Sequence, residues 1–402
     1  MSGYPFELPS PLQRALEMTR MLGKEYLRPL GLLADAQGHP HPPEHPFYQR
    51  VASMGFMERR LPGMGDKAKR QGPRWTARGA VATLEEAAYW DRGMAVSLPG
   101  PGLAGPPVMT LGTEAQRARW LEPFRDRSQP RWAAFAMTEP SAGSDVAQIQ
   151  MRCQKVGDRW VLNGAKAFSS NSPRADWIVV YATVDPALGR AGHRAFVVER
   201  DTPGLSPFRL EKKMGLVAYE TASFSLEDCE LPAENLLGGE GAYEGRAGFK
   251  SAMKTFNMSR PAIAAMAIGI GRAAYDLAHE AFEQRFETGR PIPRYQRIRE
   301  RLITMRRTLD AGRLLCWKAA WMADTEQANA LAASMSKAYA PQAAMGACRL
   351  AMEILGEAGV TRHAGVEKLF RDVKAMDIVE GTGQIQRLII ARRTLDYPRG
   401  EG

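Results

Sequence analysis

Residues 377–387, Asp-Ile-Val-Glu-Gly-Thr-Gly-Gln-Ile-Gln-Arg, combine a lone carboxylate with a predicted helix start. Thr382 is a good N-cap, and the apolar spacing of Ile385, Leu388 and Ile389 predicts a helix behind it. The unpaired backbone N–H groups of such an end attract phosphate or another anion. Glu380 close to that end suits a base-catalysed cofactor enzyme, although an acid before a helix is usually only a favourable dipole contact.

Two segments farther upstream are rich in small and hydroxyl-bearing residues. Residues 134–145 read Ala-Phe-Ala-Met-Thr-Glu-Pro-Ser-Ala-Gly-Ser-Asp, and residues 162–171 read Leu-Asn-Gly-Ala-Lys-Ala-Phe-Ser-Ser-Asn. The backbone and hydroxyls of a small, turn-forming loop such as 137–144 can approach a planar ring and a phosphate closely. An isolated Phe168 would by default be ordinary core packing.

Together the three segments resemble the signatures of the acyl-CoA dehydrogenase flavoprotein family, in the family's order and at its spacing. The matching patterns are Thr-Glu-Pro-x-Ala-Gly-Ser-Asp, Asn-Gly-x-Lys-x-Trp-Ile-Thr-Asn and Tyr-Glu-Gly-Thr-x-Gln-Ile-Gln. Gly112-Thr-Glu-Ala-Gln and Leu231-Pro-Ala-Glu-Asn-Leu-Leu-Gly also fit, so the resemblance covers essentially the whole chain.

The resemblance implies an FAD enzyme that dehydrogenates an acyl thioester, carried on CoA or a carrier protein, between its α and β carbons. Glu380 would remove the α-proton, the flavin would take the β-hydrogen as hydride, and an electron-transferring flavoprotein would accept the electrons. Burial of the carboxylate would raise its basicity, and hydrogen bonds to the thioester oxygen would stabilise the enolate. The implied flavin contacts are Met137, Thr138, Gly143, Ser144, Phe168, Ser170, Arg285, Gln296, Glu353, Gly356, Thr382 and Gln384, and the implied substrate contacts are Ser144, Asn257, Ser259, Arg260 and Gly381.

The chain departs from the family pattern at several of these positions. Phe168 and Ser170 stand where Trp and Thr are usual, which keeps an aromatic ring and a hydroxyl. Val379 stands where Tyr is frequent and would widen the pocket beside the base. The family places Arg285 and Gln296 on the flavin of a neighbouring subunit, so a homo-oligomer, a dimer or a tetramer, is expected. Thr288 replaces an aromatic residue there, Glu353 and Glu357 add carboxylates that a pyrophosphate tolerates only if they are paired, and Asn257 has lost a charge near the substrate.

The elements that must position these residues follow an α, β, α order, which predicts an α+β fold. We expect an N-terminal α-helical domain at 1–130, a middle β domain at 131–240 and a C-terminal α-helical domain at 241–402, which the resemblance makes a four-helix bundle. Trp160-Val-Leu-Asn-Gly predicts a hairpin turn. Strands are predicted at 177–182, 195–198 and 223–226, a buried helix at 262–271, an Ala-rich helix through the 330s to Leu355, and an amphipathic helix from Ile298, Leu302, Met305 and Leu309.

Composition limits the other classes of function. A chain of 402 residues with 45% hydrophobic content can bury a substantial core. Four scattered cysteines and no recognisable secretory signal predict reduced thiols and a cytoplasmic protein, and the longest apolar run, 262–271, is too short for a bilayer. Histidines 39, 41 and 45 are separated by prolines, so no metal site is expected.

Charge and fold leave two alternatives open. The net charge is +10, and residues 59–78 hold seven basic residues and one acid. We interpret this stretch as a solvated loop, which makes nucleic acid an unlikely partner, although a nucleic-acid-binding homologue shares the family's fold. A same-fold flavin oxidase or monooxygenase is the other alternative, and the retained Glu380 argues against a monooxygenase without a base.

Overall fold

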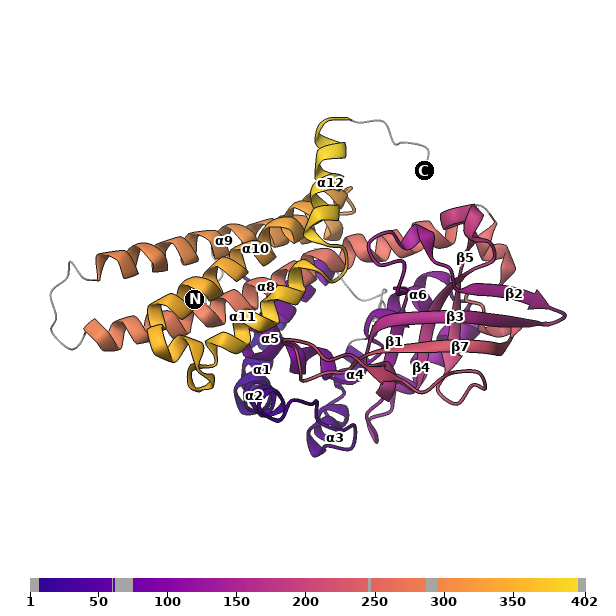
Figure 1. The fold of residues 1–402 in the computed structure, drawn as a ribbon, viewed down its shortest axis with the longest axis horizontal. Helices are drawn as coiled ribbons and strands as arrows, with labels where there is room; N and C mark the ends of the chain where they lie inside the picture. The colour runs from indigo at the N-terminus through magenta and orange to yellow at the C-terminus, as the bar shows by residue number, and fades with distance from the viewer. Residues whose placement is uncertain (1–6, 60, 62–74, 245–246, 287–294, 397–402) are drawn as a thin grey trace.

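The computed structural model describes residues 7–59, 61, 75–244, 247–286 and 295–396. Helices come first, a β-sheet follows, and long helices end the chain (Figure 1). This order confirms the α+β fold predicted from the sequence. The first helices are α1 Ser10–Leu22, α2 Arg28–Gln37, α3 Pro46–Ser53, α4 Phe56–Arg59, α5 Thr76–Ser97, α6 Gly105–Leu111 and α7 Glu114–Leu121.

The sheet is mixed and strongly buried at its centre. Its strands run in the order β1-β4-β2-β3-β7-β6, and β5 pairs antiparallel with β4, while β1 and β4 are parallel. Every residue of β4 is buried, as expected for a central strand of β-branched and aromatic residues. The strands are β1 Ala133–Ala136, β2 Arg152–Val156, β3 Arg159–Ser170, β4 Trp177–Thr183, β5 His193–Glu199, β6 Arg209–Leu210 and β7 Thr221–Pro232.

The hairpin turn predicted at Asn163-Gly164 is wrong. Strand β3 runs through both residues, and the reversal between β2 and β3 lies earlier, at Gly157, whose φ is +61°. Asn163 and Asp228 are joined by two hydrogen bonds of 3.1 and 2.8 Å, and the β3–β7 register shifts between Leu162 and Gly164. A glycine between apolar residues can mark either a hairpin turn or a bulge within a strand. Here the pairing of Asn163 with Asp228 on the neighbouring strand keeps Gly164 inside β3 as a bulge.

The C-terminal helices form an elongated bundle beside the sheet region (Figure 1). Residues 260–274 of α8 are buried without interruption, and Leu302, Met305 and Leu309 of α9 face the same core. The buried helix, the amphipathic stripe and the Ala-rich helix predicted from the sequence are therefore confirmed. The helices are α8 Ala247–Phe286, α9 Gln296–Asp324, α10 Ala330–Leu355, α11 Val366–Lys374 and α12 Gly383–Thr394.

The structure bears on the sequence-based expectations about membrane-spanning helices and about the cysteines. Across the described ranges no helix is both long and apolar enough to cross a bilayer. All four cysteines are buried free thiols.

Most of the basic stretch, residues 60 and 62–74, lies outside the described residues, but Arg78 at its end forms a 2.9 Å ion pair with Asp324 and lies over the Trp75 ring. Arg78 therefore ties the start of α5 to the end of α9.

Candidate active site

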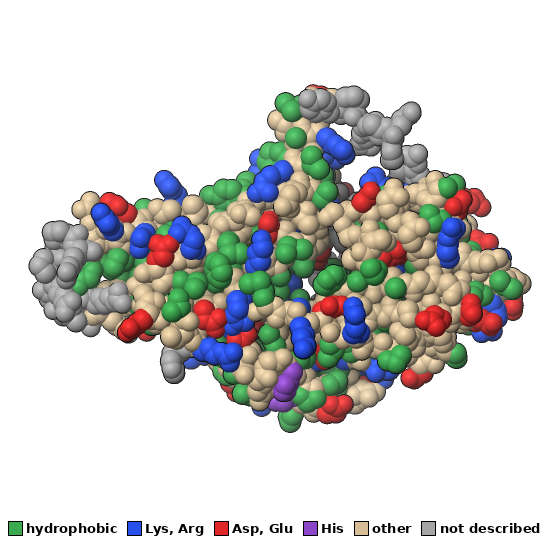
Figure 2. All heavy atoms as spheres, viewed as in Figure 1, with side chains coloured by type: hydrophobic (Ala, Val, Ile, Leu, Met, Phe, Trp, Pro, Cys, Tyr) green, Lys and Arg blue, Asp and Glu red, His purple; other side chains and the backbone are tan. Residues whose placement is uncertain are grey.

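A cavity of about 2520 Å³ lies where the helices meet the sheet region. Figure 2 shows the surface hollowed at this boundary. Segments far apart in the sequence form its walls: the end of α5, the loop after β1, the end of β3, the middle of α8 and the start of α12. The predicted site residues that line it are Met137, Thr138, Gly143, Ser144, Phe168, Ser170, Ser259, Arg260, Glu380, Gly381 and Thr382.

Glu380 occupies a backbone conformation that brings its carboxylate to this cavity just before α12. Its φ is +55° and that of Gly381 is +98°, two consecutive left-handed residues. Thr382 caps the helix as predicted, since its Oγ1 accepts a hydrogen bond of 3.3 Å from the Ile385 N–H. Ser259 of α8 donates a hydrogen bond of 2.5 Å to Glu380 Oε2. The local turn and the α8 hydroxyl together fix the carboxylate.

Burial and nearby cations act in opposite directions on Glu380. Burial raises the pKa of its carboxyl above the ordinary value, while the Ser259 hydrogen bond and the charges of Lys337, Arg92 and Arg260 oppose that rise. Lys337 of α10 is fully buried, and its Nζ donates a hydrogen bond of 3.2 Å to the Gly381 carbonyl. Burial lowers the pKa of Lys337 to about 8. Glu380 is thus a carboxylate of raised basicity held beside a buried cation.

The loop at 137–148 is held from beneath by a buried ion pair. Lys166 Nζ lies 2.7 Å from Glu139 Oε1 and donates a hydrogen bond of 3.1 Å to the Met137 carbonyl. Glu139 also accepts hydrogen bonds from the N–H groups of Gln150 and Met151, at 2.6 and 3.0 Å. Burial lowers the pKa of Lys166 to about 8. This pair fixes both ends of the loop and leaves Gly143 and Ser144 exposed at the cavity.

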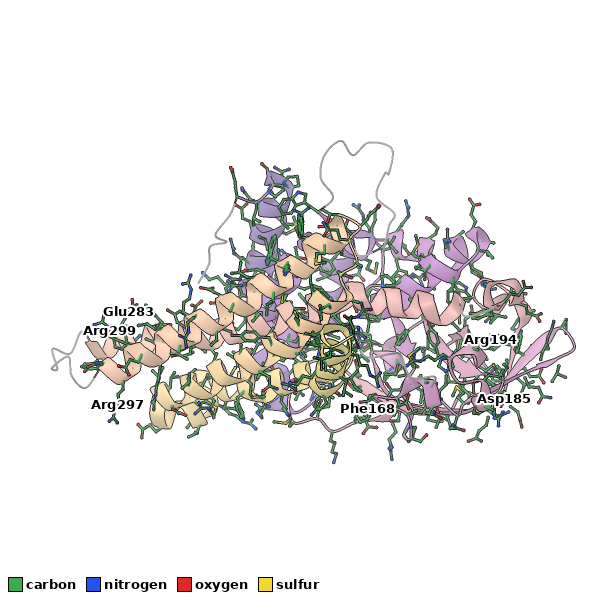
Figure 3. The ribbon with its side chains drawn as sticks, turned by 90° about the horizontal axis from the view of Figure 1, so that it is seen from above. Phe168, Asp185, Arg194, Glu283, Arg297 and Arg299 are labelled. Atoms are coloured by element: carbon green, nitrogen blue, oxygen red, sulfur yellow. The ribbon has the colours of Figure 1, made fainter. Side chains whose placement is uncertain are left out.

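The residues on the sheet side of the cavity fit a flavin. Phe168 lies at the boundary between bundle and sheet (Figure 3), with 65% of its surface exposed and a φ of +56°. A strained backbone that exposes an aromatic ring to a cavity indicates a binding surface rather than core packing. The Thr138 and Ser170 hydroxyls line the same cavity, and nothing lies within 4 Å of a Cβ built on Gly143. The planar, polar ring of a flavin would find an aromatic wall, hydroxyl partners and open space on this side of the cavity.

Several predicted flavin contacts do not line this cavity within one chain. Gln296 is exposed at the start of α9 and hydrogen-bonds to Glu300 at 3.3 Å, and Gln384 is exposed on α12. Figure 3 shows the neighbouring Arg297 and Arg299 at the far tip of the bundle from Phe168. The side chains of Asn257 and Arg285 lie outside the described residues.

The Glu353 carboxylate is paired with arginines. Its negative charge is therefore balanced, as a flavin pyrophosphate nearby would require. Arg301 lies 3.1 Å from Glu353 Oε2, and Arg349 bonds to its other oxygen. Gly356, with a φ of +67°, ends α10 beside it. Glu353, Gly356, Gln296 and Arg285 therefore remain predicted flavin contacts, which would have to act on the flavin of a second chain.

Several cations on the cavity or behind it were missed from the sequence. Arg92 and Lys213 line the cavity, and Lys337 lies behind Gly381. The one available signal was weak: Lys337 sits on the buried face of an Ala-rich helix, where a charge is unusual.

Two of the clustered histidines make local contacts in the structure. His41 contacts the Leu30 carbonyl at 2.9 Å, and His45 accepts a hydrogen bond from the Phe47 N–H.

Comparisons with known proteins agree with this arrangement. Models of the acyl-CoA dehydrogenase N-terminal, middle and C-terminal domains match residues 12–127, 134–229 and 246–395. The mitochondrial short-chain specific acyl-CoA dehydrogenase of Rattus norvegicus is 38% identical over 289 residues, 72% of this chain and 68% of that protein.

Two solved structures extend the likeness to the whole fold. Butyryl-CoA dehydrogenase from Megasphaera elsdenii has a TM-score of 0.85 and 31% identity, covering 98% of this chain and 100% of that one. The prolyl acyl carrier protein oxidase AnaB has a TM-score of 0.83 and 28% identity, covering 96% and 100%. With the three domain models matched and the flavin-fitting cavity in place, the chain belongs to the acyl-CoA dehydrogenase family of flavin-dependent oxidoreductases.

Proposed function

We propose that this protein is an FAD-dependent acyl-CoA dehydrogenase in which Glu380 removes the α-proton of an acyl thioester. The observation that carries the proposal is the position of Glu380 on the helical side of a cavity whose sheet side holds Thr138, Ser144 and Phe168. A thioester between those two walls would present its α-carbon to the carboxylate. The product would be an α,β-unsaturated thioester.

The protein's own groups supply the acid–base part of this reaction. The raised pKa of the Glu380 carboxyl brings its basicity closer to that of the weak carbon acid. The Ser259 hydroxyl and the left-handed turn at 380–381 hold one orientation of the base. Arg260 and Lys337 place positive charge beside it, which favours the enolate oxygen that develops as the proton leaves. A bound flavin would supply the hydride acceptor for the β-hydrogen.

The finer parts of the proposal concern cofactor and partners. We infer FAD as the flavin, because the predicted contacts at Arg285, Gln296 and Glu353 would serve its pyrophosphate and adenine side from a neighbouring chain. An electron-transferring flavoprotein as electron acceptor, a homo-oligomer and a cytoplasmic location stay predictions.

A flavin oxidase acting on a carrier-protein thioester is the second candidate. It is favoured by the likeness to AnaB, a prolyl acyl carrier protein oxidase. The rate at which O2 reoxidises the reduced enzyme separates the two candidates. Slow reoxidation by O2 with fast transfer to an electron-transferring flavoprotein supports the dehydrogenase, and rapid formation of hydrogen peroxide supports the oxidase.

The assignment of the base is tested with Glu380→Gln. This variant should keep its flavin and bind acyl thioester, but its anaerobic flavin reduction by saturated acyl-CoA should slow by roughly 10²–10⁴-fold. Glu230→Gln, which alters an exposed carboxylate of β7 away from the cavity lining, is the matched control and should reduce at the wild-type rate. Near-wild-type reduction by Glu380→Gln would remove Glu380 from the mechanism.

A further inference from the structure

Lys213, in the loop between β6 and β7, is a half-buried amine on the wall of the cavity. It lines the cavity together with Tyr219 and Thr221. Its Nζ donates hydrogen bonds of 2.7 Å to the Tyr219 carbonyl and of 2.9 Å to Thr221 Oγ1. The same nitrogen lies 3.7 Å from the centre of the Tyr219 ring, which favours a cation there. Three contacts from one short stretch of chain therefore fix the position of the amine.

The pairing of β3 with β7 places this amine next to the wall that fits a flavin. Thr221, the first residue of β7, is the register partner of Ser170 at the end of β3. Paired residues on antiparallel strands have Cα atoms about 4.5–5.5 Å apart. Ser170 and Phe168 line the same cavity as Thr221 and Lys213. A flavin ring held by Phe168 and Ser170 would therefore lie within electrostatic reach of Lys213.

The acids that act on Lys213 are already balanced by other cations. Glu220 forms an ion pair with Arg174, and Asp372 lies 2.6 Å from Lys368 Nζ. Across the described ranges of the chain, Lys213 itself forms no ion pair with a carboxylate. The positive charge of the Lys213 ammonium is therefore available to an anion that enters the cavity.

The protonation state of Lys213 is sensitive to such an anion. Burial lowers the pKa of Lys213 to about 7, and the charge of Arg92 lowers it as well, while Glu220 and Asp372 oppose this shift. Near neutral pH the amine therefore exists in both its neutral and its protonated form. A negative charge placed beside Lys213 raises its pKa, so the neutral form takes up a proton.

Resting on the proposed flavin site, we propose that Lys213 balances the negative charge of the reduced flavin and takes up one proton from solvent when the ring is reduced. In the proposed reaction the α-proton goes to Glu380, and the β-hydrogen carries both electrons to the flavin as hydride. The ring thereby gains one negative charge, which the Lys213 ammonium balances without forming or breaking a bond to it. Positive charge near the ring nitrogens is one way in which a protein tunes a flavin, and here it raises the reduction potential.

Anaerobic titrations with a chemical reductant and a reference dye test this proposal on the flavin-loaded enzyme without any thioester. At neutral pH the reduction equilibrium of Lys213→Met should be about tenfold less favourable than that of the wild type, which is about 30 mV in midpoint potential. Between about pH 7.5 and 9 the wild-type potential should fall about twice as steeply with pH as that of Lys213→Met, because two protons rather than one accompany the two electrons.

Two further variants separate charge from proton uptake. Lys213→Arg keeps the positive charge but does not titrate in this range, so it should restore the potential at neutral pH and leave the shallow pH dependence. Lys212→Met removes the exposed neighbouring lysine and should match the wild type in both measurements.

The outcomes separate this proposal from the function on which it rests. A folded, flavin-loaded Lys213→Met with the potential and the pH dependence of the wild type overturns the role of Lys213. If Lys213→Met holds no flavin, Lys213→Arg decides, because a pH dependence as steep as that of the wild type contradicts proton uptake by Lys213. If the titrations agree with the proposal but no acyl thioester reduces the wild-type flavin, Lys213 keeps its role and the dehydrogenase function is wrong.

Discussion

At the scale of single residues, the chemistry depends on the pKa of one carboxyl group, that of Glu380. Glu380 is made more basic by burial, and Ser259 and three cations limit that effect. Lys337 is the fully buried member of the three, and it also holds the Gly381 carbonyl next to the base. It is a positioning residue, because it acts through the Glu380–Gly381 turn and does not line the cavity.

Removing the Lys337 charge should move the pH dependence of the reaction. The cation favours ionised Glu380, so Lys337→Met should raise the pKa of the carboxyl further, and the base should become active only at higher pH. We expect the acid limb of anaerobic flavin reduction to shift upward. Lys155→Met, which removes an exposed lysine paired with Glu240, is the control. A downward shift, or an unmoved limb with normal flavin content, contradicts the role given to Lys337.

At the scale of elements, the flavin loop is positioned by one buried pair, Glu139 with Lys166. Lys166 contacts the Met137 carbonyl before the loop and Glu139 contacts the Gln150 and Met151 N–H groups after it, so the pair joins the end of β1, the start of β2 and strand β3. The loop itself is short and exposed, and little else packs over Gly143. Its geometry therefore comes from the ion pair beneath it.

Lys166→Met should lower both stability and flavin affinity. Glu139 would remain buried without its cation, which typically costs about 3–5 kcal/mol in the free energy of unfolding. Urea unfolding measures the first effect and flavin titration of the apoprotein the second. The same Lys155→Met control breaks an exposed pair and should cost about 0–1 kcal/mol. A flavin affinity equal to that of the wild type would show that the loop keeps its shape without the pair.

At the scale of the whole molecule, buried charges connect helices that are far apart in the sequence. Lys368 of α11 lies 2.6 Å from both Asp91 of α5 and Asp372, and Asp372 in turn holds the Leu216 N–H after β6. The first helices, the sheet region and the last helices therefore meet behind the cavity.

Lys368→Met should destabilise the whole chain. It leaves two carboxylates buried without a cation, and we expect a loss of about 3–5 kcal/mol in the free energy of unfolding, measured by urea titration. Arg159→Met breaks an exposed pair with Glu230 and provides the comparison, with an expected cost of about 0–1 kcal/mol. A Lys368→Met protein as stable as Arg159→Met would show that this triad does not hold the three parts together.

Assembly is the other property of the whole molecule. If Arg285 contacts the flavin of a neighbouring chain, cofactor and partner bind the same assembled state, so loss of one weakens the other. We expect a tetramer built as a pair of dimers. Arg285→Ala should lower flavin occupancy and dissociate the oligomer together on dilution, by absorbance and light scattering, while Arg209→Ala should do neither. A monomer that retains full flavin would end this linkage.

The sequence by itself determined those features that depend on neighbouring residues. The Thr382 cap, the helix behind it, the small, turn-forming loop at 137–144 and the long helices follow from local spacing and residue type, so they were predicted correctly. The three motifs also identified the family, and with it the cavity residues from Met137 to Thr382. The domain limits at 130 and 240 and the roles of individual site residues stay predictions.

Tertiary structure decided what depends on contacts across the chain. Asn163-Gly164 has the local preference of a turn, but its pairing with Asp228 keeps it inside a strand. Arg92 looks like an ordinary surface cation in the sequence and Lys337 is marked only by its Ala-rich surroundings, and only the packing of α5, α8 and α10 buries them beside Glu380. The pKa of the base depends on burial and on charges contributed by these distant helices, and neither quantity exists until the chain has folded.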